Sequence, residues 1–178
     1  MIGRQRFLAG ALAGLASPLL AAGSADAAPA AFDPQALTAI LDRPARHRQV
    51  FAVERIDGGY PLWDILAALN GYQFGFKEGP GTLHAVAVLY NSAVILGLDN
   101  TLWAKYPFGR YAAAVGDKYS LPSAGVNPFM RPHSSLNPKD DPDDAHGYYR
   151  DYSLTALRKR GVSFLVDDDS LLRMCLTM

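Results

Sequence analysis

Residues 83–106 read LHAVAVLYNSAVILGLDNTLWAKY. The run Leu83–Leu89 is largely apolar and does not alternate cleanly, which is typical of a parallel strand covered on both faces. Tyr90, Asn91 and Ser92 follow it, and we expect Asn91 to cap a helix over residues 92–98. Ligands bind at the carboxyl ends of strands in open α/β sheets, and free N–H groups at the start of a helix attract anions. The sequence therefore predicts a site for a small anionic ligand or a protein partner at Tyr90, Asn91 and Ser92.

The segments before this strand fit the same α/β pattern. Apolar residues in His47–Val53 predict a first strand. Apolar residues at helical spacing then extend from Pro61 to Phe76 and predict a helix that lays one face on a sheet. Gly79-Pro80-Gly81 comes before a strand rather than before a helix, so we interpret it as a turn and not as a phosphate loop.

The segments after the central strand continue the alternation. Asp99 has the position of a second helix start, which Tyr106-Pro107 would end. Ser153 is placed to cap a helix over residues 154–160, with Gly161 closing it in the left-handed conformation. A last strand is expected over residues 162–166, followed by an apolar tail helix.

These elements predict one domain over residues 47–178, a three-layer α/β fold with a short parallel sheet and flanking helices. Residues 28–46 form an N-terminal helical segment, in which Asp33 is expected to cap and Pro34 to begin a helix. Residues 107–152 are rich in Pro and Gly and are expected to form a long insertion, which is either a functional loop, a lid or an ill-ordered segment.

The N-terminus has the pattern of an export signal. Two arginines precede an uncharged run, and Ala25-Asp26-Ala27 matches a cleavage site. The run is shorter than the roughly 20 residues that a membrane span needs. Arg4-Gln5-Arg6-Phe7-Leu8 is similar to a twin-arginine signal except at Gln5. We predict a signal peptide over residues 1–27, export by the twin-arginine or general secretory route to the periplasm or medium, and no stable membrane span after cleavage.

Charge and cysteine content exclude several classes of function. Removal of residues 1–27 takes away Arg4, Arg6 and Asp26, so the 17 basic and 17 acidic residues become 15 and 16, a formal charge of −1. A surface so close to neutral offers no electrostatic footprint for nucleic acid. Arg158-Lys159-Arg160 is interpreted as complementing a helix dipole. Cys175 is the only cysteine, so an intramolecular disulfide and a paired-cysteine metal site are both impossible.

Other polar clusters do not indicate a metal or a cofactor. His133 and His146 accompany four aspartates in the insertion, but Ala145 stands where a calcium loop requires an oxygen ligand. The acidic run is therefore interpreted as a solvated loop. His84 is expected to be a hydrogen-bonded histidine of the core or of the sheet edge. We expect no metal and no cofactor.

The order of these motifs resembles the DsrE/DsrF-like family of small sulfur-relay proteins. The matching residues are Val86–Tyr90, Ala93-Val94, Leu98-Asp99-Asn100, Trp103-Ala104-Lys105-Tyr106 and 161–166. In that family the last strand is commonly followed by Cys-Asn-Asn, whose cysteine carries a sulfane sulfur. In this chain Asp167 stands at that position and Asp168 follows.

The resemblance leads to three hypotheses. The first is a protein of little or no catalytic activity that holds a small sulfur-related anion or a partner near Tyr90, Asn91, Ser92, Asp167 and Asp168. The second is a persulfide-carrying sulfurtransferase that uses Cys175, although a cysteine between Met174 and Leu176 is expected to be buried and inert. The third is an interaction protein. The tail helix has no closing strand after it, so we expect a C-terminally truncated fold whose open sheet edge pairs in a homo-oligomer.

Overall fold

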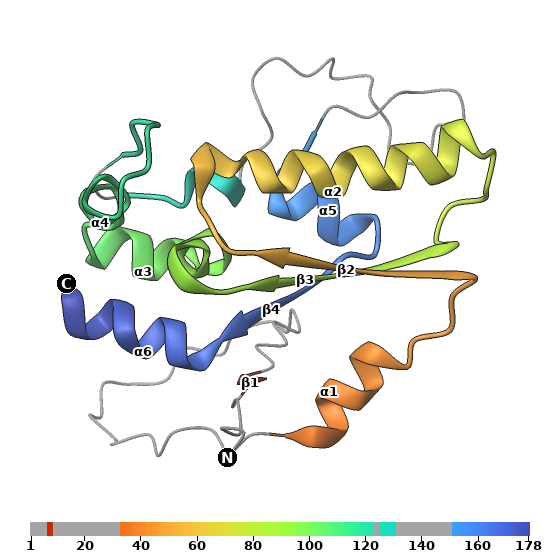
Figure 1. The fold of residues 1–178 in the computed structure, drawn as a ribbon, viewed down its shortest axis with the longest axis horizontal. Coiled ribbons are helices and arrows are strands. Elements are labelled where there is room, and N and C mark those ends of the chain that lie inside the picture. Colours follow the sequence, from red (N-terminus) through yellow and green to blue (C-terminus); the bar gives the residue numbers. More distant parts are fainter. Residues whose placement is uncertain (1–6, 9–32, 123–124, 131–150) are drawn as a thin grey trace, which may run out of the picture.

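The computed structural model describes residues 7–8, 33–122, 125–130 and 151–178. These residues form a four-stranded sheet in the order β1-β4-β3-β2 (Figure 1). β2 (His47–Val53), β3 (Leu83–Leu89) and β4 (Ser163–Asp167) run parallel, and β1 (Phe7–Leu8) pairs antiparallel with the outer edge of β4. The predicted short parallel sheet is therefore confirmed, and its central strand is β3.

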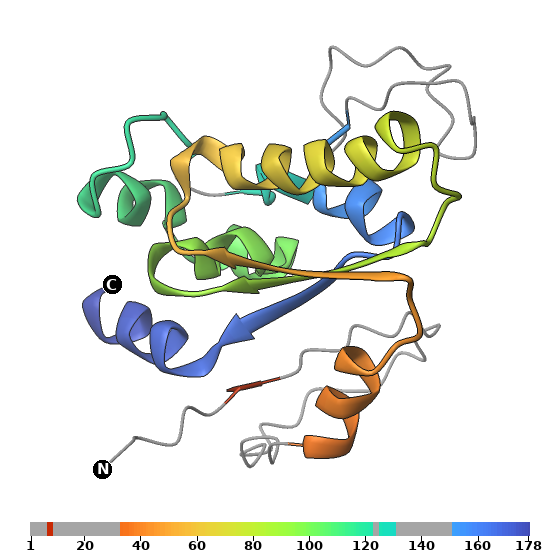
Figure 2. The same ribbon diagram turned by 45° about the vertical axis from the view of Figure 1, so that its right-hand side comes forward.

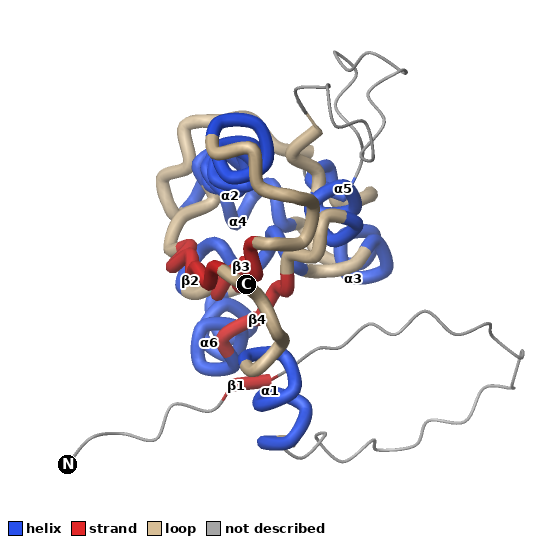
Figure 3. Tube along the Cα trace, turned by 90° about the vertical axis from the view of Figure 1, so that its right-hand side faces the viewer, coloured by secondary structure: helices blue, strands red, loops and turns tan. Residues whose placement is uncertain are grey.

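Helices lie on both faces of the sheet. α2 (Tyr60–Asn70) and α5 (Leu154–Lys159) lie on one face, and α1 (Pro34–Leu41) and α6 (Asp168–Thr177) lie on the other, as the view along the sheet shows (Figure 3). α3 (Asn100–Lys105) and α4 (Phe108–Ala114) lie toward the carboxyl ends of the strands (Figure 2). The molecule therefore has the three-layer α/β arrangement that the sequence predicts.

The helical spacing after Pro61 produces the expected packing. Leu62, Ile65, Leu66 and Leu69 form the buried face of α2. Each such side chain contributes about 1.5–3 kcal/mol through burial of its apolar surface. The chain stays helical beyond α2 through a π-helical turn over Gly71–Gly75. Phe76 at its end is 74% exposed, so the prediction that the apolar face packs on the sheet as far as Phe76 is wrong at this residue.

Side chains cap the N-termini of three helices at the residues predicted from the sequence. Asp33 accepts hydrogen bonds from the N–H groups of Gln35 and Ala36, Asp99 accepts one from Leu102, and Ser153 accepts one from Ala156. At the end of α5, Gly161 has a φ of 89°, the left-handed conformation that glycine adopts without strain.

Asn91 does not cap a helix, which corrects the sequence prediction. The chain enters 3₁₀ turns over Asn91–Gly97, whose cap position is Tyr90, and no side chain caps them. Asn91 itself lies in the left-handed region with a φ of 49°, which asparagine tolerates better than most residues. Its side chain bonds to Glu54 instead, so it is engaged with the end of β2 rather than with the following turn.

The expected insertion is partly regular structure. Its first part contains α4, and residues 125–130 carry buried Asn127 and Phe129 into the core. Asn127 Nδ2 donates to the carbonyl oxygens of Leu96 (2.8 Å) and Leu98 (2.6 Å), which fixes this segment on the 3₁₀ turns. The four clustered aspartates, His133 and His146 lie outside the described residues. Within the described ranges, no helix is both long and apolar enough to cross a membrane.

Candidate functional site

The carboxyl ends of β2 and β3 meet at the predicted switch residues. Tyr90 N–H donates to the carbonyl oxygen of Val53 at 3.0 Å, which extends the pairing of the two strands by one residue. Asn91 Nδ2 then donates to Glu54 Oε1 at 3.1 Å, and Ser92 Oγ donates to the Glu54 carbonyl oxygen at 3.4 Å. The switch therefore brings Tyr90, Asn91 and Ser92 together with the residues that follow β2.

Two backbone N–H groups at the switch already have acceptors within the protein. Asn91 N–H donates to Ser170 Oγ at 2.8 Å, and Ala93 N–H donates to the carbonyl oxygens of Glu54 (3.3 Å) and Tyr90 (3.1 Å). These two N–H groups are therefore not available to an anion, which corrects the expected mode of binding for them.

A cleft of about 510 Å³ opens beside the switch. It lies between the chain after β2, the start of the 3₁₀ turns, α4 and α6. Polar residues on its wall are Glu54, Arg55, Asn91, Ser92, Ser170, Arg173 and Thr177, and Tyr111, Ala114, Val115 and Met174 contribute apolar surface. The position is the one at which open α/β sheets hold ligands.

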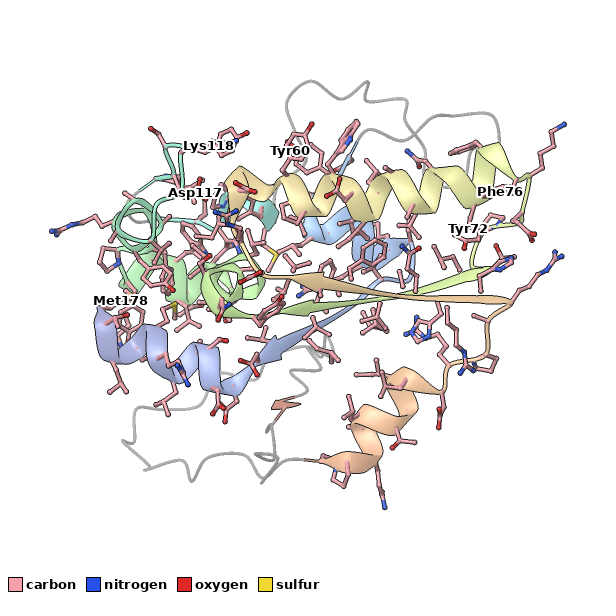
Figure 4. The ribbon with its side chains drawn as sticks, viewed as in Figure 1. Tyr60, Tyr72, Phe76, Asp117, Lys118 and Met178 are labelled. Atoms are coloured by element: carbon pink, nitrogen blue, oxygen red, sulfur yellow. The ribbon has the colours of Figure 1, made fainter. Side chains whose placement is uncertain are left out.

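The wall opposite the switch is fixed by the loop that follows α4. Asp117 Oδ2 accepts a hydrogen bond from Gly58 N–H at 3.2 Å, so this loop is tied to the turn after β2. Figure 4 shows Asp117 and Lys118 near that turn, and Met178 at the end of α6. The α4 side of the cleft is therefore connected to the turn that follows β2.

Two arginines supply the positive charge of the cleft. Arg55 follows β2 and Arg173 lies on α6, and both are exposed. Among the described residues neither forms an ion pair, so both guanidinium groups remain available to a ligand. Burial raises the pKa of Tyr111, so its hydroxyl stays protonated at neutral pH. The cleft thus combines two cations, one carboxylate at Glu54 and the protonated hydroxyl of Tyr111.

Asp167 organises the cleft without lining it. It caps α6 by accepting hydrogen bonds from Ser170 N–H and Ser170 Oγ–H. Ser170 in turn accepts the N–H of Asn91, so the chain Asp167–Ser170–Asn91 connects the start of α6 to the switch. Asp168 lies in the first turn of α6, where a carboxylate stabilises the helix dipole, and it is not on the cleft wall.

Cys175 is exposed on α6, so the expectation of a buried thiol is wrong. The apolar neighbours Leu172 and Leu176 are also exposed, at 57% and 79%, because this face of α6 points away from the sheet. Cys175 is not among the residues on the cleft wall. The structure therefore separates the thiol from the switch residues that the sequence placed in the same site.

Some residues of the cleft escaped the sequence analysis. Arg55 comes two residues after β2, and the rule that found Tyr90 at the end of β3 applies equally at that strand end. Tyr111 and Arg173 had no comparable signal, since their places depend on how α4 and α6 pack. In the parts of the chain that the structure describes, no cluster of three or more metal-ligating side chains is present.

Comparison with known proteins finds no significant match to this chain. No protein-family model matches the sequence, and no curated protein or solved structure is significantly similar to it.

Proposed function

We propose that this protein is an exported DsrE-like protein that binds a small anion in the cleft beside Asn91. The observation that carries this proposal is the pair Arg55 and Arg173, two arginines without a carboxylate partner among the described residues, on one cleft at the strand ends. Arginine binds oxyanions through paired hydrogen bonds. The motif order that resembles the DsrE/DsrF-like family favours a sulfur oxyanion as the ligand.

Binding rather than catalysis fits the cleft. Its described wall residues include hydroxyl groups, at Ser92, Ser170 and Tyr111, but no cysteine and no histidine. A serine needs an adjacent base to act as a nucleophile. The two described histidines, His47 and His84, lie at the amino ends of β2 and β3, whereas the cleft lies at the carboxyl ends of these strands.

Calorimetric titration of the purified protein with thiosulfate tests the proposal. Arg55→Gln and Arg173→Gln should each weaken binding roughly fivefold, the scale of one partly exposed charged hydrogen bond. Arg48→Gln is the matched control, because Arg48 is equally exposed but lies near the start of β2. Equal affinity in all three variants, or no heat of binding, would refute an anion site between the arginines.

The exposure of Cys175 supports a second candidate function, that of a persulfide carrier. An accessible thiol can take up one sulfur atom from a sulfane-sulfur donor to form a persulfide, and the donor is released with one sulfur atom fewer. Intact mass before and after treatment should show one added sulfur atom that reductant removes, and none in Cys175→Ser. No mass gain in the unsubstituted protein would eliminate this candidate.

The outer edge of β4 supports a third candidate, a homo-oligomer. The described partner of this edge is β1, which pairs with only Val166 and Asp167. β1 lies within the proposed signal peptide, so cleavage after Ala27 would remove it and leave the edge open to another chain. The intact mass of the exported protein should equal that of a chain that begins at Ala28. Light scattering of this cleaved protein should then show more than one subunit. A monomer at high concentration would contradict this candidate.

A further inference from the structure

A second hollow lies at the opposite end of the sheet from the cleft. It has a volume of about 310 Å³ and is formed by the end of α2, the turn before β3 and the end of α5. Leu69, Tyr72 and Leu83 give it an apolar wall, and Gln73, Lys159 and Arg160 give it a polar one. Figure 4 shows Tyr72 at the end of the helical segment that continues α2, close to the chain that enters β3.

Hydrogen bonds fix the polar wall. Arg160 Nη1 donates to Asn70 Oδ1 at 2.7 Å, and Arg160 Nη2 donates to Gln73 Oε1 at 2.8 Å. Because Oε1 of Gln73 accepts from the guanidinium, the amide can turn only one way, with Nε2 as its donor. The orientation of Gln73 is therefore set by the protein before any ligand arrives.

The Nε2 group of Gln73 is buried and has no hydrogen-bond partner among the described residues. A buried donor without an acceptor is unfavourable, and a missing water or ion is one of the reasons for such an atom in a native protein. The missing group must offer an acceptor oxygen. Lys159, exposed on the same wall and without an ion pair in the described ranges, favours an oxygen that carries negative charge.

We propose that this hollow is a second binding site, for a small organic anion. An oxygen of the anion accepts the hydrogen bond from Gln73 Nε2, and its charge lies near the cationic groups of Lys159 and Arg160. The apolar body of the ligand packs on Leu69, Tyr72 and Leu83. Gly79, Pro80 and Gly81 line the hollow on the side of the chain that enters β3.

The side-chain amide signal of Gln73 reports directly on this site. In ¹H–¹⁵N spectra of the full chain, the Gln73 NH₂ resonance should shift saturably on addition of phenyl phosphate, and the Gln73→Leu variant identifies that resonance by its loss. Inorganic phosphate should bind roughly tenfold more weakly, because it lacks the ring that buries apolar surface. An ordered water instead of an anion would leave the resonance unchanged by either compound, and that result would overturn the proposal.

Charge variants separate this site from general attraction of anions. Lys159→Gln should weaken phenyl phosphate binding roughly three- to tenfold. Arg158→Gln makes the same charge change one residue away, off the wall of the hollow, and should leave the affinity unchanged. Arg173→Gln, in the cleft beside Asn91, should also leave it unchanged. Equal weakening by Arg158→Gln, or loss of binding in Arg173→Gln, would contradict the proposal, and neither result depends on the function proposed for that cleft.

Discussion

Replacement of Ser170 by alanine should loosen the connection between α6 and the switch. Ser170 is 7% exposed, and its hydroxyl both accepts the N–H of Asn91 and donates to Asp167. The substitution removes two hydrogen bonds and leaves the Asn91 N–H without its acceptor. A neutral hydrogen bond contributes about 1 kcal/mol and one to a carboxylate somewhat more. Ser170→Ala should therefore lower the free energy of unfolding by about 2–3 kcal/mol.

Urea unfolding followed by circular dichroism measures this loss. Ser120→Ala removes the same oxygen atom from an exposed serine and should change the free energy of unfolding by less than about 0.5 kcal/mol. Because Asn91 is held at a φ of 49° by the same network, Ser170→Ala should also weaken thiosulfate binding in the cleft. A loss of stability no larger than that of Ser120→Ala would refute the role given to Asp167–Ser170–Asn91.

Three further predictions concern the core and its ionisable groups. Asn127→Ala should lower the free energy of unfolding in urea by about 4 kcal/mol, because the carbonyls of Leu96 and Leu98 and the N–H of Phe129 lose their hydrogen-bond partner. Thr101→Ala, at a nearby exposed residue, should be near neutral. Gly109→Ala should lower the free energy of unfolding by at least about 2 kcal/mol, because the added Cβ would lie 2.3 Å from the Pro122 carbonyl oxygen. Gly71→Ala is the control, since its Cβ would meet no atom within 4 Å, and it should be neutral or slightly stabilising. A neutral Gly109→Ala would contradict this packing. Burial, with Arg43 and Arg48 nearby, lowers the pKa of His84 below 6.5, so the unfolded chain binds its proton first as the pH falls. The unfolding free energy should therefore decrease from pH 7 to pH 5, and a slope unchanged in His84→Phe would rule out this cause.

Local signals in the sequence were enough to predict most of the fold. Asp33, Asp99 and Ser153 cap helices as expected because an N-cap depends on a residue and its next three neighbours. The uniform apolar run at β3 predicted a strand buried on both faces, and the strand is nearly all buried. These features depend on short stretches of chain and are therefore visible in the sequence alone.

The candidate site depended on contacts that no short stretch contains. Asn91 has the residue type of a cap, but Glu54 and Ser170, 37 and 79 residues away, hold it in a left-handed conformation. Cys175 lies between two apolar residues, yet it is exposed because α6 turns that face away from the sheet. Arg55 and Arg173 share one cleft only after β2 and α6 have packed on the same end of the sheet.

Crystals of the protein grown with thiosulfate test the central claim most directly, since the sulfur atoms of the ligand give an anomalous signal. The account predicts a peak in the cleft beside Asn91, within hydrogen-bond distance of the guanidinium groups of Arg55 and Arg173. It also predicts a lower peak in Arg173→Gln crystals of the same form when the thiosulfate concentration is near the dissociation constant of the unsubstituted protein. A cleft without the peak at saturating thiosulfate, or a peak of equal height in Arg173→Gln at that lower concentration, would contradict the claim that these two arginines form an anion site.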